Sequence, residues 1–329
     1  MLWVMCITPC ANVRRQGYFA HNIYPMRLAA IDIGSNAVRL LINDVTTYKD
    51  GSLDYTKVNL VRVPLRLGFD VFETGFIPES KIQKLVDTML AYKHLMEVYE
   101  VQGLKVCATS AMRDAVNSAD IVKRVYQETG IQINVISGSE EAMILYETHL
   151  AESMDKKYGY LYIDVGGGST ELTLYGKGRD VVKKSFNIGT IRLLKNQVDD
   201  DTWDEMKYFV REQVQAGIPT VAIGTGGNIS KVFSISKRKI GKPLTLELLK
   251  EYHKEMNPLS VEERMHRYGF RVDRADVIVP ALHIYINVMR WAGIQEIYVP
   301  QIGLADGLIR LLYQERSFTS LMGLKNMVK

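Results

Sequence analysis

Residues 160–172, which read YLYIDVGGGSTEL, constrain this chain more than any other stretch. A short apolar run, typical of a buried strand, leads into Asp164, three glycines, a Ser-Thr pair and Glu171. Glycine lets backbone N–H groups approach an anion without a side chain in the way, and carboxylates suit a hard cation. Because a carboxylate repels phosphate unless a divalent cation lies between them, the stretch predicts a metal-assisted phosphate site.

A shorter version of the same pattern stands near the start of the chain. Residues 28–36 read LAAIDIGSN, in which an apolar run leads into Asp32 and then Gly34. One Asp-x-Gly after a strand is equally well an ordinary turn. Two copies, each opening one half of the chain, indicate an internal duplication. We therefore expect two lobes that present their Asp-x-Gly turns to one ligand in the cleft between them.

Size and composition limit the classes of protein that remain. The chain has 329 residues, enough for two domains, and its 47% hydrophobic and 24% charged residues are ordinary for a globular protein. A net charge of +4 allows an anionic ligand without demanding nucleic acid. No apolar run reaches the roughly 18–20 residues of a membrane span. Three cysteines form neither a disulfide framework nor a zinc motif. We predict a cytoplasmic protein without membrane or specific nucleic-acid partners.

The first 25 residues differ from the rest of the chain. They show no periodicity and precede a second methionine, Met26. Arg14 and Arg15 follow the apolar part, whereas a signal peptide carries its positive charge before it. We interpret residues 1–25 as a non-native or disordered extension; a signal or anchor, or a structural arm, would also fit the segment.

The remaining chain shows one order of elements twice, three strands followed by helices that alternate with strands. Antiparallel strands followed by parallel crossovers are not the regular alternation of a dinucleotide-binding fold. The pattern predicts an α/β protein with two lobes, 26–147 and 148–329, each with a five-stranded mixed sheet flanked by helices. The second lobe carries a helical insertion at about 240–275. We expect a glycine-containing loop over 66–75 and one long helix over 273–291.

Seven motifs occur in one order along the chain: IDIGSN at 31–36, ATSAMRDA at 108–115, VISGSEEA at 135–142, IDVGGGSTEL at 163–172, NIGTIRL at 187–193, IGTGGN at 223–228 and RADVIVPAL at 274–282. Together they resemble the exopolyphosphatase / guanosine pentaphosphate phosphohydrolase (Ppx/GppA) family, in its short two-domain form, over about residues 26–314. The resemblance implies the duplicated actin-like ATPase, or ribonuclease-H-like, fold. It also implies Mg²⁺-dependent release of terminal phosphate from inorganic polyphosphate or guanosine pentaphosphate.

Motif by motif, the resemblance implies roles for single residues. Glu141 would activate the attacking water, Asp164 and Glu171 would surround the metal and the water, and Arg113 would contact phosphate. The implied phosphate-binding residues are Gly34, Ser35 and Asn36 in one loop, Gly166, Gly167, Gly168, Ser169 and Thr170 in a second, and Gly226, Gly227 and Asn228 in a third. Locally, Glu140 and Glu141 also suit a helix N-terminus, and Gly226-Gly227 also suits a strand-to-helix turn.

Basic residues are frequent after position 180, and a polyphosphate chain needs a positive groove that leads away from the active site. Arg267, Arg271 and Arg274 are the candidates for such a channel, because they lie near a matched motif. The chain also departs from the family pattern. Met143 replaces a usual Arg, and Ala305-Asp306-Gly307 stands where Arg-Glu often precedes a Gly. These departures bear on the substrate rather than on the reaction class.

The sequence therefore predicts a phosphohydrolase that releases terminal orthophosphate from inorganic polyphosphate. In this hypothesis Mg²⁺ lies near Asp164 and Glu171, and Glu141 draws a proton from an in-line water. Guanosine pentaphosphate is the main competing substrate. The same motifs are also compatible with an ATP-dependent kinase of the same fold and with a non-catalytic sensor of guanosine tetraphosphate or polyphosphate. A homodimer is compatible with the sequence, although no motif specifies it.

Overall fold

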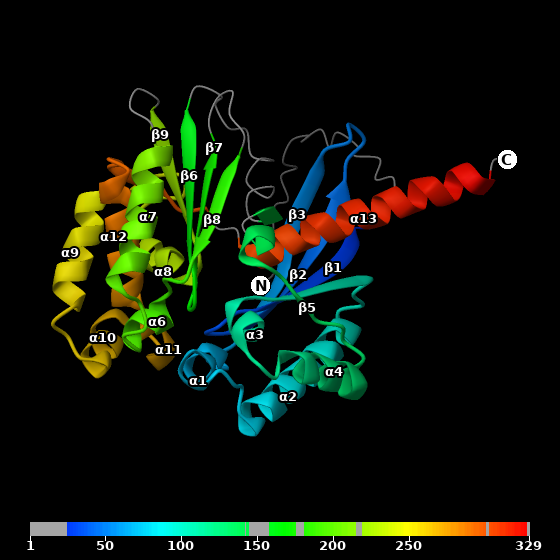
Figure 1. Ribbon diagram of the computed structural model, residues 1–329. Coiled ribbons are helices and arrows are strands. Elements are labelled where there is room, and N and C mark those ends of the chain that lie inside the picture. The colour runs from blue at the N-terminus through cyan, green and yellow to red at the C-terminus, as the bar shows by residue number, and fades with distance from the viewer. Residues whose placement is uncertain are drawn as a thin grey trace, which may run out of the picture.

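The computed structural model describes residues 25–141, 143–144, 158–175, 181–214, 219–300 and 303–327. Two lobes, each built around one β-sheet, lie side by side (Figure 1). Nearly all of the segment 1–25 lies outside the described residues, so its interpretation as an extension stays a prediction.

The first sheet has five strands in the order β3-β2-β1-β4-β5. These are β1 (Met26–Ile33), β2 (Val38–Thr47), β3 (Leu53–Val63), β4 (Gly103–Ala108) and β5 (Asn134–Val135). The first three pair antiparallel, whereas β4 runs parallel to β1 and β5 parallel to β4. The helices between β3 and β5 are α1 (Leu67–Thr74), α2 (Glu79–Val98), α3 (Ser110–Asp114) and α4 (Ser118–Thr129). The segment expected as a loop over 66–75 is therefore largely helix α1.

The second sheet repeats this arrangement and adds one strand. Its order is β10-β11-β9-β6-β7-β8. The strands are β6 (Gly159–Val165), β7 (Thr170–Tyr175), β8 (Val182–Phe186), β9 (Thr220–Thr225), β10 (Leu244–Thr245) and β11 (Glu296–Tyr298). When β6, β7, β8, β9 and β11 are matched to β1–β5, the two orders are the same, which confirms the predicted duplication. The sixth strand, β10, arises because two residues of the helical insertion pair antiparallel with β11.

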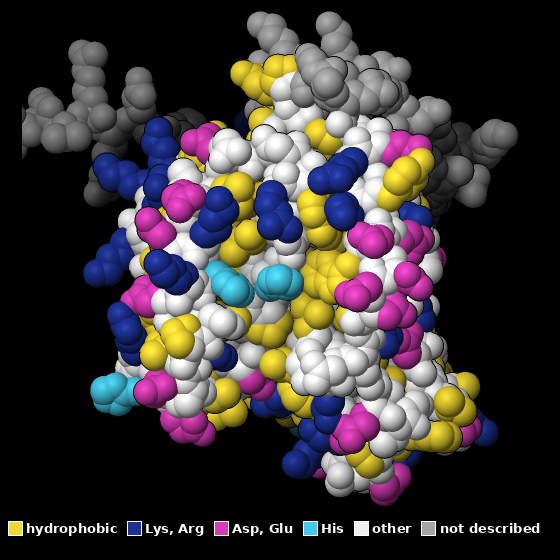
Figure 2. Space-filling view, turned by 60° about the vertical axis from the view of Figure 1, so that its left-hand side comes forward, with side chains coloured by type: hydrophobic (Ala, Val, Ile, Leu, Met, Phe, Trp, Pro, Cys, Tyr) yellow, Lys and Arg dark blue, Asp and Glu magenta, His cyan; other side chains and the backbone are white. Residues whose placement is uncertain are grey.

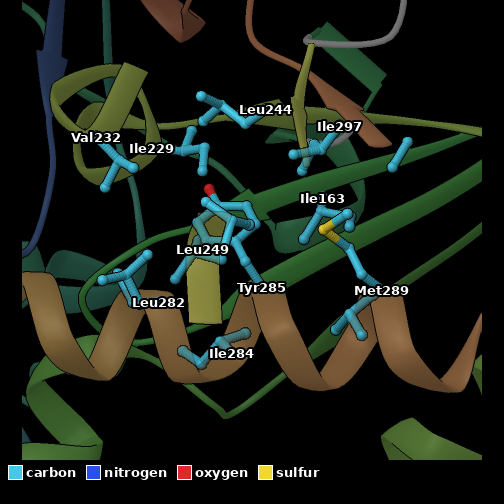
Figure 3. Packing of buried hydrophobic residues seen from close by; sticks show 14 of the residues in the cluster. Ile163, Ile229, Val232, Leu244, Leu249, Leu282, Ile284, Tyr285, Met289 and Ile297 are labelled. Carbon is cyan, nitrogen blue, oxygen red and sulfur yellow. The ribbon is translucent and has the colours of Figure 1, made fainter. Parts of the chain in front are cut away.

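The core of the second lobe packs around its longest apolar helix, α12 (Ile278–Trp291). Figure 3 shows Tyr285 and Met289 of α12 among side chains from the sheet and from α9. The remaining helices of this lobe are α6 (Thr190–Leu194), α7 (Asp200–Gln213), α8 (Gly227–Ile235), α9 (Leu246–Met256), α10 (Val261–Tyr268) and α11 (Val272–Ala275). The expected single helix over 273–291 is thus two helices. Pro280 lies in the first turn of α12, where its missing N–H leaves no intrahelical hydrogen bond unmade.

The last helix, α13 (Leu304–Met327), belongs by its packing to the first lobe rather than to the second. Its buried face, with Leu304 and Leu308, shares a cluster with Leu28 and Leu41 of the first sheet. Figure 1 shows α13 crossing β1 and β2. The assignment of everything after residue 148 to the second lobe therefore does not hold for this helix, because its apolar stripe covers the open face of the first sheet.

This packing predicts that Leu308→Ala lowers the free energy of unfolding by about 2–5 kcal/mol, since the side chain is fully buried and leaves a cavity. Urea denaturation followed by circular dichroism measures the loss. Ile240→Ala is the control, because Ile240 is 85% exposed and its truncation is expected to change stability by no more than about 0.5 kcal/mol. A loss below about 1 kcal/mol for Leu308→Ala would contradict the role assigned to α13.

Candidate active site

Strand pairing alone places three functional side chains of the second lobe in one row. Asp164 of β6 lies directly opposite Glu171 of β7, and Glu171 lies opposite Ser185 of β8. Directly opposed residues project from the same face of a sheet. The glycine loop between Asp164 and Glu171 is therefore the hairpin that sets two carboxylates side by side.

The first lobe has the corresponding row with different chemistry. Asp32 of β1 lies opposite Arg39 of β2, and Arg39 lies opposite Arg62 of β3. The Arg39 Nη1 atom donates a hydrogen bond of 2.7 Å to Asp32 Oδ2. Arg39 thus occupies the position that Glu171 has in the second lobe, so the aspartate of the first lobe is neutralised by its own neighbour.

A cavity of about 310 Å³ lies between the lobes, where the duplication predicted a cleft. Residues of both lobes line it. Among the predicted residues these are Gly34, Ser35, Asn36, Glu141, Asp164, Gly166, Gly167, Ser169, Gly226, Gly227, Asn228 and Arg274. The sequence did not single out Arg39, Lys57, Ser110 or Ser230, which also line it. Arg39 could have been found by aligning the two copies of the motif, where it matches Glu171.

Three carboxylates lie close together at this place: Glu141 and Asp164 line the cavity, and Glu171 lies next to them outside its lining. One oxygen each of Glu141, Asp164 and Glu171 lies within 4.8 Å of the others. Burial, with the neighbouring carboxylates, raises the pKa of Asp164 to about 6 and that of Glu171 to about 7. The same two causes raise the pKa of Glu141 well above its ordinary value. Glu141 Oε2 is buried and accepts no hydrogen bond from the part of the chain that the structure describes, so the cluster fits a hard divalent cation, which would balance its charge.

Two serine hydroxyls fix the carboxylate of Glu171. Ser169 Oγ donates a hydrogen bond of 2.6 Å and Ser185 Oγ one of 2.9 Å, both to Glu171 Oε1. Because both bonds use the same oxygen, they set the orientation of the carboxylate without using Oε2. Ser169 is therefore a hydrogen-bond partner of Glu171 in this structure, whereas the family resemblance implied that it binds phosphate.

Arg113 of α3 lies behind the proposed base rather than in the cavity. Its Nη1 atom donates a hydrogen bond of 2.9 Å to the Ile136 carbonyl and is 4.0 Å from Glu141 Oε2. The cavity lining does not include Arg113. Its charge opposes the rise in the pKa of Glu141. A contact between Arg113 and phosphate stays a prediction.

The backbone N–H groups of Gly34 and Gly166 close their own turns, whereas Gly226 has a conformation and surroundings that require glycine. Gly34 N–H donates to the Ala37 carbonyl over 3.1 Å, and Gly166 N–H donates to the Ser169 carbonyl over 2.9 Å. Both turns are thus closed in the same way, and these two amides are used within the turns. Gly226 has a φ of +98°, and a Cβ there would lie 3.0 Å from Asp164 Oδ1.

Gly167 and Gly168 allow the second lobe to approach the first. A Cβ on Gly167 would lie 2.8 Å from the Cβ of Ser35, and one on Gly168 would lie 2.2 Å from Phe72 Cζ of helix α1. Gly168 does not line the cavity, and neither does Thr170, whose hydroxyl donates to the Ile188 carbonyl over 2.6 Å. The sequence reasoning assigned both residues to phosphate and missed the contact with α1.

Further contacts join the lobes beside the cavity. Asn36 Nδ2 donates a hydrogen bond of 2.8 Å to the Asp273 carbonyl, and Arg62 Nη2 lies 2.5 Å from Asp273 Oδ2. Ion pairs also connect Arg66 to Asp276, Arg192 to Asp114, and Lys195 to Glu73. The lobes are therefore in direct contact on more than one side of the cavity.

The three arginines predicted to form a channel lie in different surroundings. Arg274 lines the cavity, donates to Asn228 Oδ1, and has a pKa lowered to about 10 by burial and by the nearby Arg62 and Arg39. Arg271 is exposed, and Arg267 is exposed and paired with Glu255. Figure 2 shows Lys and Arg interspersed with Asp and Glu on one face of the molecule, without a continuous basic stripe. A polyphosphate channel stays a prediction.

The departures from the family pattern also have clear positions. Met143 is exposed at 43%, outside the cavity lining. Ala305 and Asp306 line the cavity at the start of α13, where Asp306 Oδ2 accepts a hydrogen bond of 2.8 Å from Gly303 N–H. The departure from the family pattern at Ala305 and Asp306 therefore alters side chains that line the cavity.

Comparison with known proteins places this geometry in a family. The model of the Ppx/GppA phosphatase family matches residues 45–315. The chain is 26% identical over 323 residues to "Exopolyphosphatase 1" of Mycobacterium bovis, covering 90% of this chain and 91% of that protein. It is 36% identical over 169 residues to the "Bifunctional 3-dehydroquinate synthase/phosphatase" of Fusobacterium nucleatum. That match covers 50% of this chain and only 25% of the bifunctional protein.

A solved structure agrees with the fold. The crystal structure of the Ppx/GppA family member of Aquifex aeolicus superposes with a TM-score of 0.68 at 27% identity. The match covers 88% of this chain and 98% of that one. The two-lobed arrangement is therefore that of a known structural family.

The raised carboxylate pKa values predict how stability depends on pH. Glu171 has a pKa of about 7 in the folded protein, against 4.5 for an ordinary glutamate. Between these values the folded state holds a proton that the unfolded state has lost, so the free energy of unfolding falls as pH rises. Compared with Glu171→Gln, we expect the wild type to lose on the order of 1–3 kcal/mol from about pH 4.5 to 7 in EDTA.

Urea denaturation at several pH values measures this difference. Added Mg²⁺ is expected to remove most of the loss, because a bound cation favours the ionised carboxylates. Parallel stability curves for the wild type and Glu171→Gln in EDTA would show that the pKa of Glu171 is not raised in the folded protein.

Proposed function

This chain belongs to the Ppx/GppA phosphatase family, and we propose that it releases terminal orthophosphate from inorganic polyphosphate. One observation carries the proposal. Carboxylates from both lobes converge within 4.8 Å in a cavity that is also lined by glycine turns, a helix N-terminus and arginines. That combination provides a cation site, anion donors and a base in one enclosed volume.

Hydrolysis of a phosphoanhydride needs an aligned water and neutralisation of the charge on the transferred phosphoryl group. Mg²⁺ held by Asp164 and Glu171 would supply that neutralisation. Glu141 takes the proton of the attacking water, and its buried Oε2, which has no hydrogen-bond partner among the described residues, is the acceptor. Arg113 lies 4.0 Å from this oxygen and favours the ionised form that a base requires.

Other residues of the cavity lining would hold the phosphate oxygens. Gly227 and Asn228 are the first residues of α8, and the first N–H groups of a helix have no partner within it. Arg274 reaches this helix start through its hydrogen bond to Asn228, and Arg39 lies close to Gly227. We infer that the phosphate chain is held between this helix start and the carboxylates.

Guanosine pentaphosphate is the second candidate substrate, and the apolar residues of the cavity lining support it. Leu41, Leu60 and Leu304 form an apolar part of the cavity. Inorganic polyphosphate has no apolar group that would use such a surface, whereas a nucleoside has one. Lys57 and Asp306 lie in the same lining and can contact the polar edge of a base.

A side-by-side assay of phosphate release separates the candidates. Long polyphosphate, short polyphosphate, guanosine pentaphosphate and ATP are each supplied with and without Mg²⁺. We expect Mg²⁺-dependent release from polyphosphate without any acceptor molecule. Faster release from guanosine pentaphosphate would favour the second candidate, and phosphate transfer that requires an acceptor would indicate a kinase. Tight binding of polyphosphate without turnover in Mg²⁺ would indicate a sensor.

Glu141→Gln tests the proposed base. The variant keeps the size and polarity of the side chain but cannot take a proton, so we expect kcat to fall by about 10²–10⁴-fold while substrate affinity is kept. Glu140→Gln is the matched control. Glu140 accepts hydrogen bonds from Ser137 N–H and Oγ, lies exposed at the helix start, and its substitution is expected to leave kcat within about threefold of the wild type. Wild-type turnover in Glu141→Gln would remove Glu141 from the mechanism.

Location and assembly remain predictions of the sequence. Within the described ranges, none of the helices combines the length and hydrophobicity that a membrane crossing requires. We keep the cytoplasmic location and the homodimer as proposals, and gel filtration with light scattering tests the second of these.

A further inference from the structure

The short segment that carries Glu141, residues 138–141, touches the second lobe at Gly138. Residues 138–141 are helical and belong to the first lobe. A Cβ on Gly138 would lie 2.6 Å from Ser185 Oγ and 2.7 Å from Ser185 Cβ, both of strand β8. The same Cβ would lie 3.6 Å from Glu171 Oε1. The two lobes therefore meet at this point with no room for a side chain.

Backbone conformation does not explain the glycine at 138. Its φ is not in the positive range that favours glycine, unlike that of Gly130 or Gly226. In a helix, alanine is preferred to glycine by about 0.5–1 kcal/mol. The remaining physical reason for glycine at this position is the close approach of Ser185.

Ser185 in turn holds the carboxylate of Glu171. Its hydroxyl donates to Glu171 Oε1 over 2.9 Å, and the two residues are directly opposed on β8 and β7. Ser185 does not line the cavity, so it acts on the site through Glu171 rather than on the substrate. One serine thus contacts both the loop that carries the proposed base and the proposed metal ligand.

We propose that Gly138 and Ser185 are positioning residues, whose contact sets the separation between Glu141 of the first lobe and Glu171 of the second. This inference rests on the proposed function of that site. Neither residue touches the substrate. The pair acts as a spacer: when the lobes are in contact, it fixes the distance between residues 138–141, which carry Glu141, and strands β7 and β8, which carry Glu171 and Ser185.

The segment between Gly138 and Glu141 is stiff enough to transmit a displacement. Glu141 N–H donates to the Ser137 carbonyl over 3.0 Å, and Glu140 Oε2 accepts from Ser137 N–H over 2.7 Å. The Ile136 carbonyl is held by Arg113. A side chain at position 138 must therefore either displace Ser185 from Glu171 or move the whole turn, including Glu141. Misplacement by about 1 Å can cost about 10²-fold in rate.

The test combines a substitution that adds a side-chain atom at position 138, next to Ser185, with a substitution that removes the side chain of Ser185. Gly138→Ala adds the Cβ, whereas Ser185→Gly removes both atoms that this Cβ would meet. We expect Gly138→Ala to lower kcat by about 10–100-fold with KM changed less than about threefold. Ser185→Gly loses one hydrogen bond to a carboxylate and is expected to lower kcat by about tenfold. The double variant is expected to return to the level of Ser185→Gly, since the added methyl group then has space.

Two further measurements separate positioning from a general structural effect. Urea denaturation of each variant is expected to give an unfolding free energy close to that of the wild type. Isothermal titration with Mg²⁺ alone, without substrate, is expected to show affinity weakened at least about fivefold in Gly138→Ala and recovered in the double variant to the level of Ser185→Gly. Ser139→Ala is the control in the same turn, because Ser139 is exposed and its hydroxyl contacts that of Ser137, away from Ser185.

Wild-type kcat and Mg²⁺ affinity in Gly138→Ala would overturn the inference, as would a double variant no better than Gly138→Ala. Either result would leave the proposed function intact if Glu141→Gln is inactive. If the wild type releases phosphate from none of the substrates, the proposed function fails instead. The Mg²⁺ titration then decides the spacer role on its own.

Discussion

The pairing of β6 with β7 forces Asp164 and Glu171 together, and the rest of the site depends on that juxtaposition. Burial and the nearby Asp32 raise the pKa of Asp164 to about 6, whereas burial and the charge of Asp164 raise that of Glu171 to about 7, so this buried row is unfavourable when both carboxylates are ionised. Glu141 approaches the same point from the other lobe and adds a third carboxylate. Because the cross-strand register fixes the first two, the cluster cannot relax by moving apart. It can relax only by taking up protons or a cation.

The duplication explains why one cavity offers both cation and anion chemistry. In each lobe an aspartate ends the first strand and faces a residue of the second strand, Glu171 in one lobe and Arg39 in the other. The third strand continues each row, with Ser185 in one lobe and Arg62 in the other. One copy is therefore acidic and the other basic, although both have the same backbone. A ligand in the cavity lies near Asp164 of the acidic row and Arg39 of the basic row, which suits a phosphate chain bound with a cation.

Local pattern predicts the sheets, the duplication and the pair of Asp164 and Glu171, because strands and Asp-x-Gly turns are encoded by neighbours in sequence. Glu141 joined this pair only through the family resemblance, since its local sequence equally suits a helix N-terminus. Local pattern does not predict the conformation or role of a residue that packs against the other lobe, because its contacts are distant in sequence. The segment 66–75 was expected to be a loop because it contains Gly68 and ends at Gly75, yet it forms α1, and Phe72 of this helix packs against Gly168. Within the triplet 166–168, Gly167 approaches Ser35 and Gly168 approaches Phe72, so packing between the lobes requires glycine at these two positions. The order of elements along the chain predicts that the last helix belongs to the second lobe, whereas its apolar stripe, with Leu308, covers the first sheet.

Distribution of the cluster over two lobes makes its geometry conditional on their contact. Asp164 and Glu171 stay together whatever the lobes do, but Glu141 joins them only while residues 138–141 lie against β8. Some of the ion pairs beside the cavity, those of Arg192 with Asp114 and of Lys195 with Glu73, involve partly exposed side chains and each contributes little in water. The close contacts made by Gly138, Gly167 and Gly168 instead require shape complementarity, which is lost as soon as the lobes separate by a fraction of a side chain. The glycines at the boundary therefore define the arrangement in which the proposed base, the proposed metal ligands and the glycine turns meet, whereas the exposed charged pairs leave the lobes able to part and admit a ligand.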